Sequence, residues 1–279
     1  VVPPMALLEK HGSDAVRYWA ASARLGVDAT FDEQQMKIGR RLAMKVLNAS
    51  KFALSMGGEG ASADVDVAAV TEPADRAVLA GLADVVDEAT ASFDAYDHTR
   101  ALELAESCFW SFCDDYLELV KDRAYSDDPS ARSARVALNV AVDVFLRLLA
   151  PFIPYATEEV WSWFRTGSVH RAAWPSSEPL RAAAAGADAE ILRVAGEALT
   201  ALRKVKSENK VSQRTTYAAV SIEVAEADRA RLDAVHADLV RAAHVRGDLS
   251  LTAAKQDGPV IVASYELDPP EPKKPRSKK

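Results

Sequence analysis

The sequence has few of the features that mark secreted, metal-binding or membrane proteins. Only two of its 279 residues are cysteines, Cys108 and Cys113, which cannot frame a disulfide scaffold or a cysteine-based zinc site. No apolar run approaches the roughly 18–20 residues that a membrane-spanning helix requires, and the first residues lack the basic-then-apolar order of a secretion signal. These absences favour a cytoplasmic protein without a membrane partner or a bound metal.

Glycine is also scarce, with 12 residues, whereas alanine is abundant and apolar residues recur at steps of three and four. Both features favour helices. A capping box formed by Thr30 and Glu33 is expected to begin the longest N-terminal helix, and a loop is expected at 57–70. The helices that we predict lie at 5–25 (two short ones), 32–56, 74–95, 98–125 and 129–149, with a shorter one from Pro154. Their shared apolar faces predict a mainly α, antiparallel helical bundle.

The chain changes character after residue 175. A predicted helix at 188–209 is followed by strand-like alternation at 217–224 and 260–267, with a helical segment at 227–243 between them. We interpret residues 187–267 as a small C-terminal α/β module, an appendage to the bundle. Residues 268–279 are rich in proline and lysine and are predicted to form a disordered basic tail.

The charge distribution limits the kind of nucleic-acid site that the protein can have. The net charge of −7 argues against a general nucleic-acid binder, and we expect no DNA partner. The last seven residues contribute +5 to this total, which leaves −12 for the rest of the chain. An RNA site in the body of the protein would therefore be a local basic patch on an acidic surface.

The predicted helix at 32–56 carries such a patch. No acidic residue occurs between Gln34 and Ser55. At about 100° per residue, five side chains of this helix fall within an arc of about 80°; they are Lys37, Arg41, Lys45, Asn48 and Phe52. Lysine and arginine neutralise phosphates, an amide bonds a base edge, and a phenylalanine ring stacks on a base. We call the predicted RNA-binding set the basic stripe; its core is Lys37, Arg41, Lys45, Asn48 and Phe52, flanked by Arg40 and Lys51. A solvated face that only balances an acidic protein is the alternative.

A second group of cations follows the predicted helix at 188–209. These secondary RNA-binding candidates are Lys204, Lys206, Lys210 and Arg214. No catalytic residue is predicted: neighbours such as Asp114 and Asp115 diverge by about 100° on a helix and cannot act together on one proton. The tryptophans at helical spacing, Trp110, Trp161 and Trp163, are expected to be core residues.

Five segments together carry a family resemblance. They are Gly12–Tyr18 (GSDAVRY), Asp28–Asp32 (DATFD), Gly39–Phe52 (GRRLAMKVLNASKF), Trp110–Tyr116 (WSFCDDY) and Leu149–Trp161 (LAPFIPYATEEVW). In this order and spacing they resemble the C-terminal half of valyl-tRNA synthetases, class I enzymes that activate valine with ATP and transfer it to tRNA. Isoleucyl and leucyl relatives share the PFIP and EEVW patterns, whereas the Gly39–Phe52 run favours the valine family.

The resemblance implies a role for each part of the chain. Residues 1–31 would be a remnant of the stem-contact fold and 32–174 the anticodon-binding helical bundle, with the basic stripe at the anticodon loop of the valine tRNA. The catalytic and editing domains and both class I ATP signatures are missing. We therefore expect an inactive, monomeric fragment without a cofactor, and ATP with magnesium only in the full-length ligase. The alternatives are a non-enzymatic helical protein-interaction module and the same region of an isoleucyl-type relative.

Overall fold

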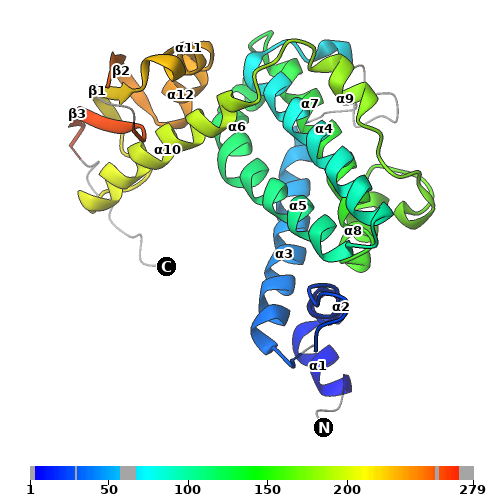
Figure 1. Ribbon diagram of the computed structural model, residues 1–279. Coiled ribbons are helices and arrows are strands. Elements are labelled where there is room, and N and C mark those ends of the chain that lie inside the picture. The colour runs from blue at the N-terminus through cyan, green and yellow to red at the C-terminus, as the bar shows by residue number, and fades with distance from the viewer. Residues whose placement is uncertain (1–3, 29, 57–66, 255–257, 270–279) are drawn as a thin grey trace, which may run out of the picture.

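The computed structural model describes residues 4–28, 30–56, 67–254 and 258–269. A helical bundle has a pair of short helices at one end of α3 and an α/β module beside it (Figure 1). This architecture confirms the predicted fold class. Residues 57–66 of the expected loop and residues 270–279 of the expected tail lie outside the described residues. None of the helices in the described part of the chain is long and apolar enough to cross a membrane.

The N-terminal pair and the bundle consist of α1 (Pro4–His11), α2 (Ser13–Ala21), α3 (Glu33–Ser55), α4 (Pro73–Asp94), α5 (His98–Ser111), α6 (Leu117–Tyr125), α7 (Ala131–Leu149) and α8 (Pro154–Ser162), with short 3₁₀ turns at Val67–Ala69 and Val169–Arg171. Asp32 caps α3, since its carboxylate accepts the backbone N–H of Gln34 at 2.8 Å. The predicted Thr30–Glu33 capping box is wrong, because Glu33 instead receives Lys10 and His11 from the end of α1.

The core of the bundle lies around α7, most of whose residues are buried. Its wide apolar face is enclosed by other helices, since α3, α4, α5, α6 and α8 all pack against it. The apolar face of the helix predicted at 98–125 is buried. The rings of Phe109 and Phe112 on this face lie 5.3 and 5.2 Å from that of Phe145.

The predicted helix at 98–125 is not continuous. A π-helical turn at Phe112–Tyr116 separates α5 from α6. The wider π turn accommodates the two successive four-residue steps between Phe112, Tyr116 and Val120, so that all three side chains stay on the buried face. The carbonyl oxygen of Asp114, in this turn, accepts a hydrogen bond from outside the bundle, from Nη1 of Arg203 at 3.3 Å.

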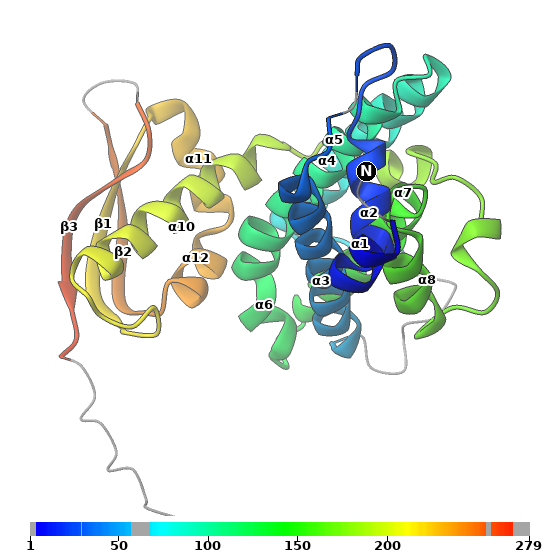
Figure 2. The same ribbon diagram turned by 90° about the horizontal axis from the view of Figure 1, so that it is seen from below.

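The C-terminal module is a two-layer α/β unit. Its elements, with the short helix that precedes them, are α9 (Glu178–Ala183), α10 (Glu190–Glu208), β1 (Tyr217–Val224), α11 (Glu226–Ala234), α12 (His236–Ala242), β2 (Val245–Ala253) and β3 (Ile261–Leu267). The sheet has the order β2-β1-β3, with β2 parallel and β3 antiparallel to β1. Figure 2 shows α10, α11 and α12 on the side of the sheet that faces the bundle.

Two features of this module differ from the prediction. The helical segment expected at 227–243 is broken at Val235 into α11 and α12. Strand β2 was not predicted, because Gly247 and Asp248 in its middle are typical of a turn. The glycine is needed there, since a Cβ atom at position 247 would lie 1.9 Å from the carbonyl oxygen of Ala218, where the β1–β2 register shifts.

A buried guanidinium joins the module to the bundle. Arg123, at the end of α6 and 2% exposed, donates two hydrogen bonds to Asp75 of α4 and two to Asp238 of α12, at 2.8–3.0 Å. Its remaining N–H donates to the carbonyl oxygen of Ser130 at 3.0 Å, so all five donors are used. Burial acts to lower the pKa of Arg123, but the bonds to both carboxylates hold it above its ordinary value. We call Arg123, Asp75 and Asp238 the buried ionic triad.

Arg123→Met is expected to lower the free energy of unfolding by about 3–5 kcal/mol, because two buried carboxylates lose their cation. Urea denaturation followed by circular dichroism measures the change. Arg193→Met is the matched control: its ion pairs with Glu190, Glu197 and Asp228 are solvent-exposed or nearly so and should contribute about 1 kcal/mol or less. Equal effects of the two substitutions would contradict a structural role for the triad.

The N-terminal pair docks on the bundle through a glycine. A Cβ atom at Gly39 of α3 would lie 2.5 Å from the Cβ and 2.6 Å from the Cγ of Tyr18, so the ring of Tyr18 lies directly against the backbone of α3. The hydroxyl of Tyr18 donates to Glu106 Oε2 of α5 at 2.6 Å. Tyr18 therefore fixes α2 to two helices of the bundle.

Two glycine substitutions distinguish the effect of this close contact on stability from the effect of replacing a glycine within a helix. Gly81→Ala in α4, where nothing lies within 4 Å of the added Cβ, is expected to stabilise the protein by up to about 1 kcal/mol. Gly39→Ala is expected to destabilise it by about 1–3 kcal/mol, because the methyl group overlaps the inner atoms of Tyr18. Thermal denaturation of both variants tests the pair, and stabilisation by Gly39→Ala would show that α2 does not pack as described.

Candidate nucleic-acid interface

Helix α3 presents the basic stripe to solvent along its length. Its buried positions, which face the bundle, are Met36, Gly39, Leu42, Val46, Ala49, Ser50 and Ala53. On the opposite face Lys37, Arg40, Arg41, Asn48 and Lys51 are exposed, and Lys45 is partly exposed. Within the described residues, the side chains of Lys37, Asn48 and Lys51 take part in no hydrogen bond or ion pair. They are thus open to an external ligand.

Trp110 of α5 lies beneath two cations of the stripe. The guanidinium carbon of Arg41 is 5.1 Å and the Nζ of Lys45 is 5.5 Å from the centroid of the indole ring, which are cation–π distances. The indole Nε1 donates to Glu106 Oε1 at 3.2 Å, while Tyr18 occupies the other oxygen of this carboxylate. Trp110 packs partly against the core, as expected, but it also holds two charges of the candidate interface in place. No sequence pattern distinguished this role.

Two cations of the stripe have partners within the protein. Arg40 donates to the carbonyl oxygen of Lys10 at the C-terminal end of α1, at 2.8 Å, so it also helps to dock the N-terminal pair. Lys45 forms an ion pair with Asp114 at 3.0 Å. Of the two, only Lys45 is paired with an acid, so Arg40 keeps its full charge at the surface beside Lys37, Arg41 and Lys51.

Phe52 lies at the end of the stripe and is only partly open. One side of its ring packs against the bundle core. Its neighbour is Tyr125 at the end of α6, with ring centroids 5.6 Å apart and planes at 80°. Tyr125 is 62% exposed, so the two rings form an edge-to-face aromatic pair at the surface. Tyr125 was missed in the sequence because nothing in the spacing of α6 relates it to α3.

The secondary candidates do not form one site. Lys204 is exposed beside Glu208, at 3.9 Å, and Lys210 and Arg214 are exposed in the turn after α10. Lys206 is only 2% exposed: its Nζ donates to the carbonyl oxygens of Gln213 and Ala243 at 3.0 and 2.8 Å. The prediction that Lys206 contacts RNA is therefore corrected. The residue lies one helical turn after Leu202, on the face of α10 that packs into the module.

The described residues provide little for other chemistry. They contain no group of three or more His, Cys, Asp or Glu that could hold a metal ion. Burial raises the pKa of the Cys108 and Cys113 thiols to about 12, so neither is a thiolate at neutral pH. Trp161 is buried, whereas Trp163 is exposed, contrary to its expected place in the core.

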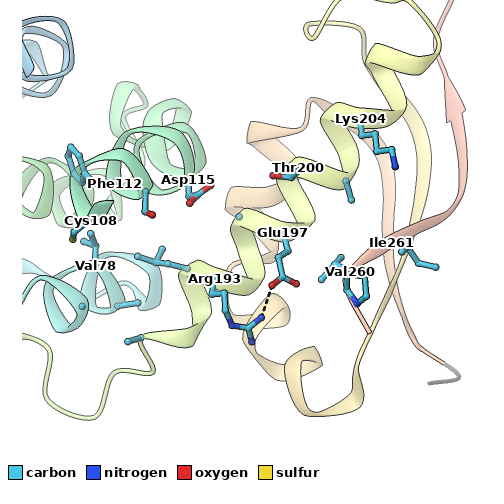
Figure 3. A pocket seen from close by; sticks show the side chains of 18 of the residues that line it. Val78, Cys108, Phe112, Asp115, Arg193, Glu197, Thr200, Lys204, Val260 and Ile261 are labelled. Atoms are coloured by element: carbon cyan, nitrogen blue, oxygen red, sulfur yellow. Dashed lines mark hydrogen bonds and ion pairs between the residues drawn. The ribbon is translucent and has the colours of Figure 1, made fainter. Parts of the chain in front are cut away.

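A cavity of about 900 Å³ lies between the bundle and the module (Figure 3). Its bundle side includes Val78, Phe112 and Asp115, while α10 and the start of β3 form the other walls. Burial raises the pKa of Asp115, and neighbouring Asp114 adds to this effect. The Arg193 charge at the rim is already paired with Glu197, as Figure 3 shows. This largely apolar cavity is distinct from the basic stripe and offers little to a nucleic acid.

Comparison with known proteins identifies the family. Residues 75–224 match the family described as the anticodon-binding domain of tRNA ligase. The chain belongs to this family. The matched residues of the anticodon-binding domain begin in α4 and end with β1, so they include Trp110 and the buried ionic triad partners Asp75 and Arg123 but not the basic stripe on α3.

The chain is similar over nearly its whole length, stripe included, to valine–tRNA ligases. It is 54% identical over 274 residues to that of Thermobifida fusca, which covers 97% of this chain and 30% of the relative. It is 50% identical over 307 residues to that of Bifidobacterium longum subsp. infantis, and this match covers 99% of this chain and 33% of the relative. The chain thus spans about a third of the length of these relatives.

The fold of the anticodon-binding domain also has a solved counterpart. It is similar to a chain in the LeuRS–tRNA–LeuAMS ternary complex of Agrobacterium radiobacter K84, with a TM-score of 0.50 and 18% sequence identity. The similarity covers 64% of this chain and 21% of that chain. At this identity the similarity concerns the fold alone.

The burial of Lys206 has a measurable pH dependence. Burial lowers its pKa from 10.5 to about 8, so between these values the unfolded state binds more protons and stability rises with pH. The neutral amine keeps two N–H donors, enough for both carbonyl oxygens. The free energy of unfolding of the anticodon-binding domain, relative to Lys206→Met, should therefore increase between about pH 7 and about pH 10.

Urea denaturation at several pH values measures this difference, and Lys204→Met, which alters an exposed lysine of the same helix, is the control. A constant difference between the original chain and Lys206→Met across this range would contradict the burial of a charged lysine at position 206.

Proposed function

We propose that this chain is the tRNA-binding part of a valine–tRNA ligase and that the basic stripe of α3 contacts the anticodon loop of the valine tRNA. Its membership of the anticodon-binding family and its identity of about half with valine–tRNA ligases support this assignment. The observation that carries the proposal is the row of solvent-facing polar side chains on α3. Among the described residues, Lys37, Asn48 and Lys51 of this row have no hydrogen-bond or ion-pair partner.

Phosphate binding is the first part of the proposed mechanism. Lys37 and Lys51 reach solvent without a partner among the described residues, and Arg41 is held by its cation–π contact with Trp110. Each phosphate that a cation neutralises adds about 0.7 to the salt dependence for a single strand. Because the indole fixes the guanidinium of Arg41, less side-chain freedom is lost when that arginine binds.

Base recognition is the second part. Asn48, between the cations, can both donate to and accept from a base edge. The aromatic pair of Phe52 and Tyr125 offers exposed ring surface at the end of the stripe, where an unstacked loop base can pack. The position of this pair beside Lys51 matches what a single-stranded loop presents: a charged backbone with bases turned outward.

The activity of the whole protein is part of the same proposal. A valine–tRNA ligase attaches valine to its tRNA with ATP and magnesium and releases AMP, and we propose that this chain contributes tRNA binding but no catalysis. An aminoacylation assay with the chain alone should then give no product. We further propose that it acts in the cytoplasm as a monomer.

The stripe is tested by fluorescence anisotropy with an anticodon stem–loop of the valine tRNA. Binding should weaken as salt increases and when two anticodon bases are changed. Lys37→Gln combined with Lys51→Gln should weaken binding and lower the salt slope by about 1.4. The control, Arg229→Gln, removes an exposed cation of α11, outside the stripe, and should leave binding unchanged. Equal binding of both stem–loops would instead favour a protein-interaction module.

A further inference from the structure

A second charged surface lies where the bundle meets the module. A cavity of about 320 Å³ opens between α6 on one side and α10, the turn after it and the end of α12 on the other. We call it the junction cleft. The ionisable residues that line it are Glu118, Lys121, Asp122, Arg203, Lys206, Arg214 and His244. Four of them are lysine or arginine and two are acids, so the cleft has an excess of positive charge.

The acids do not neutralise all of these cations. Glu118 is shared by Lys121, at 2.8 Å, and Arg203, at 3.1 Å. The guanidinium of Arg214 is exposed and makes no hydrogen bond or ion pair with any residue that the structure describes. Lys206 adds a further positive charge, because it is buried in the wall of the cleft.

His244 faces the same charges from the module side. Its backbone has a φ of 56°, a left-handed conformation that is unfavourable for a residue with a side chain, and within the described chain its ring makes no hydrogen bond. Burial lowers the pKa of His244, and Lys206, Lys121 and Arg214 lower it further, while Asp122 acts in the opposite direction. Three cations and one acid therefore act on the imidazole, which lies in a positive field that Asp122 only partly offsets.

Side-chain contacts connect the cleft with the basic stripe. Lys45 of the stripe pairs with the carboxylate of Asp114 at 3.0 Å, and Arg203 donates to the carbonyl oxygen of the same residue at 3.3 Å. Arg203 then bonds Glu118, which also holds Lys121. A chain of direct contacts thus leads from α3, across the π-helical turn, to the cleft, and α6 lies between α3 and the module in both views (Figures 1 and 2).

We propose that the junction cleft binds a phosphate group of the RNA backbone, with Arg214, Lys121 and Arg203 as donors and His244 beside them. That the phosphate belongs to RNA rests on the proposed function. A guanidinium fork and an ammonium group suit phosphate oxygens. Apart from His244, the residues lining the cleft include no aromatic ring on which a base would stack, so the ligand is backbone rather than base. One RNA strand then contacts both the bundle and the module.

The first test measures binding of a full-length valine tRNA transcript by fluorescence anisotropy. Arg214→Gln should weaken binding several-fold and lower the salt slope by about 0.7, the value for one lost phosphate contact. Arg229→Gln is the matched control, because it also removes one exposed arginine of the module. If Arg214→Gln binds like the control while the stripe variant binds more weakly, the cleft proposal is overturned and the proposed function stands.

The second test does not depend on RNA. The ring resonances of His244 are followed by NMR while inorganic phosphate is added to the whole chain. A dianion in the cleft should raise the pKa of His244, and Arg214→Gln should abolish this shift, whereas Arg229→Gln should not. A pKa that phosphate leaves unchanged overturns the cleft proposal, even if tRNA binds. If tRNA fails to bind but the shift occurs, the phosphate site stands and the proposed function falls.

Discussion

The placement of the two halves of this protein depends on one buried cation. Arg123 uses all five donors on Asp75, Asp238 and the backbone of Ser130, and so joins α4, α6 and α12 away from water. A buried arginine between two carboxylates tolerates little displacement, because each lost bond leaves a charge unpaired in a medium of low dielectric constant. Together with the packing of α10 and α12 on the bundle, the triad therefore fixes where the module lies, and with it the contact of Arg203 with Asp114.

An acidic protein needs a particular arrangement to present a positive surface. Here the cations on α3 are separated by role: Arg40 and Lys45 are bound to neighbouring elements, whereas Lys37 and Lys51 remain open and Arg41 is oriented by Trp110. Acids elsewhere keep the chain at −7 overall, so its long-range attraction for polyanions is weak. Association with RNA would then depend on this local geometry rather than on net charge.

Periodicity was sufficient to predict the long helices of the bundle, but not strand β2, the breaks in two helices or the long-range contacts. The positions of the long helices and the exposed face of α3 follow from the 3.6-residue repeat, because burial on one side is what makes such a repeat. Strand β2 was hidden because Gly247 is imposed by a close approach to Ala218. The burial of Lys206, the pairing of Tyr125 with Phe52 and the contact of Trp110 with two cations all depend on which elements meet in space. The periodicity of a single sequence does not show which elements meet. The domain boundaries remain predictions.

Glu106 gives the N-terminal pair a direct mechanical connection to the candidate interface. One oxygen of its carboxylate accepts from the hydroxyl of Tyr18 on α2, and the other accepts from the indole of Trp110, on which Arg41 and Lys45 rest. This carboxylate therefore links the N-terminal pair to the ring that supports two cations of the basic stripe, in addition to the direct packing of Tyr18 on Gly39 of α3.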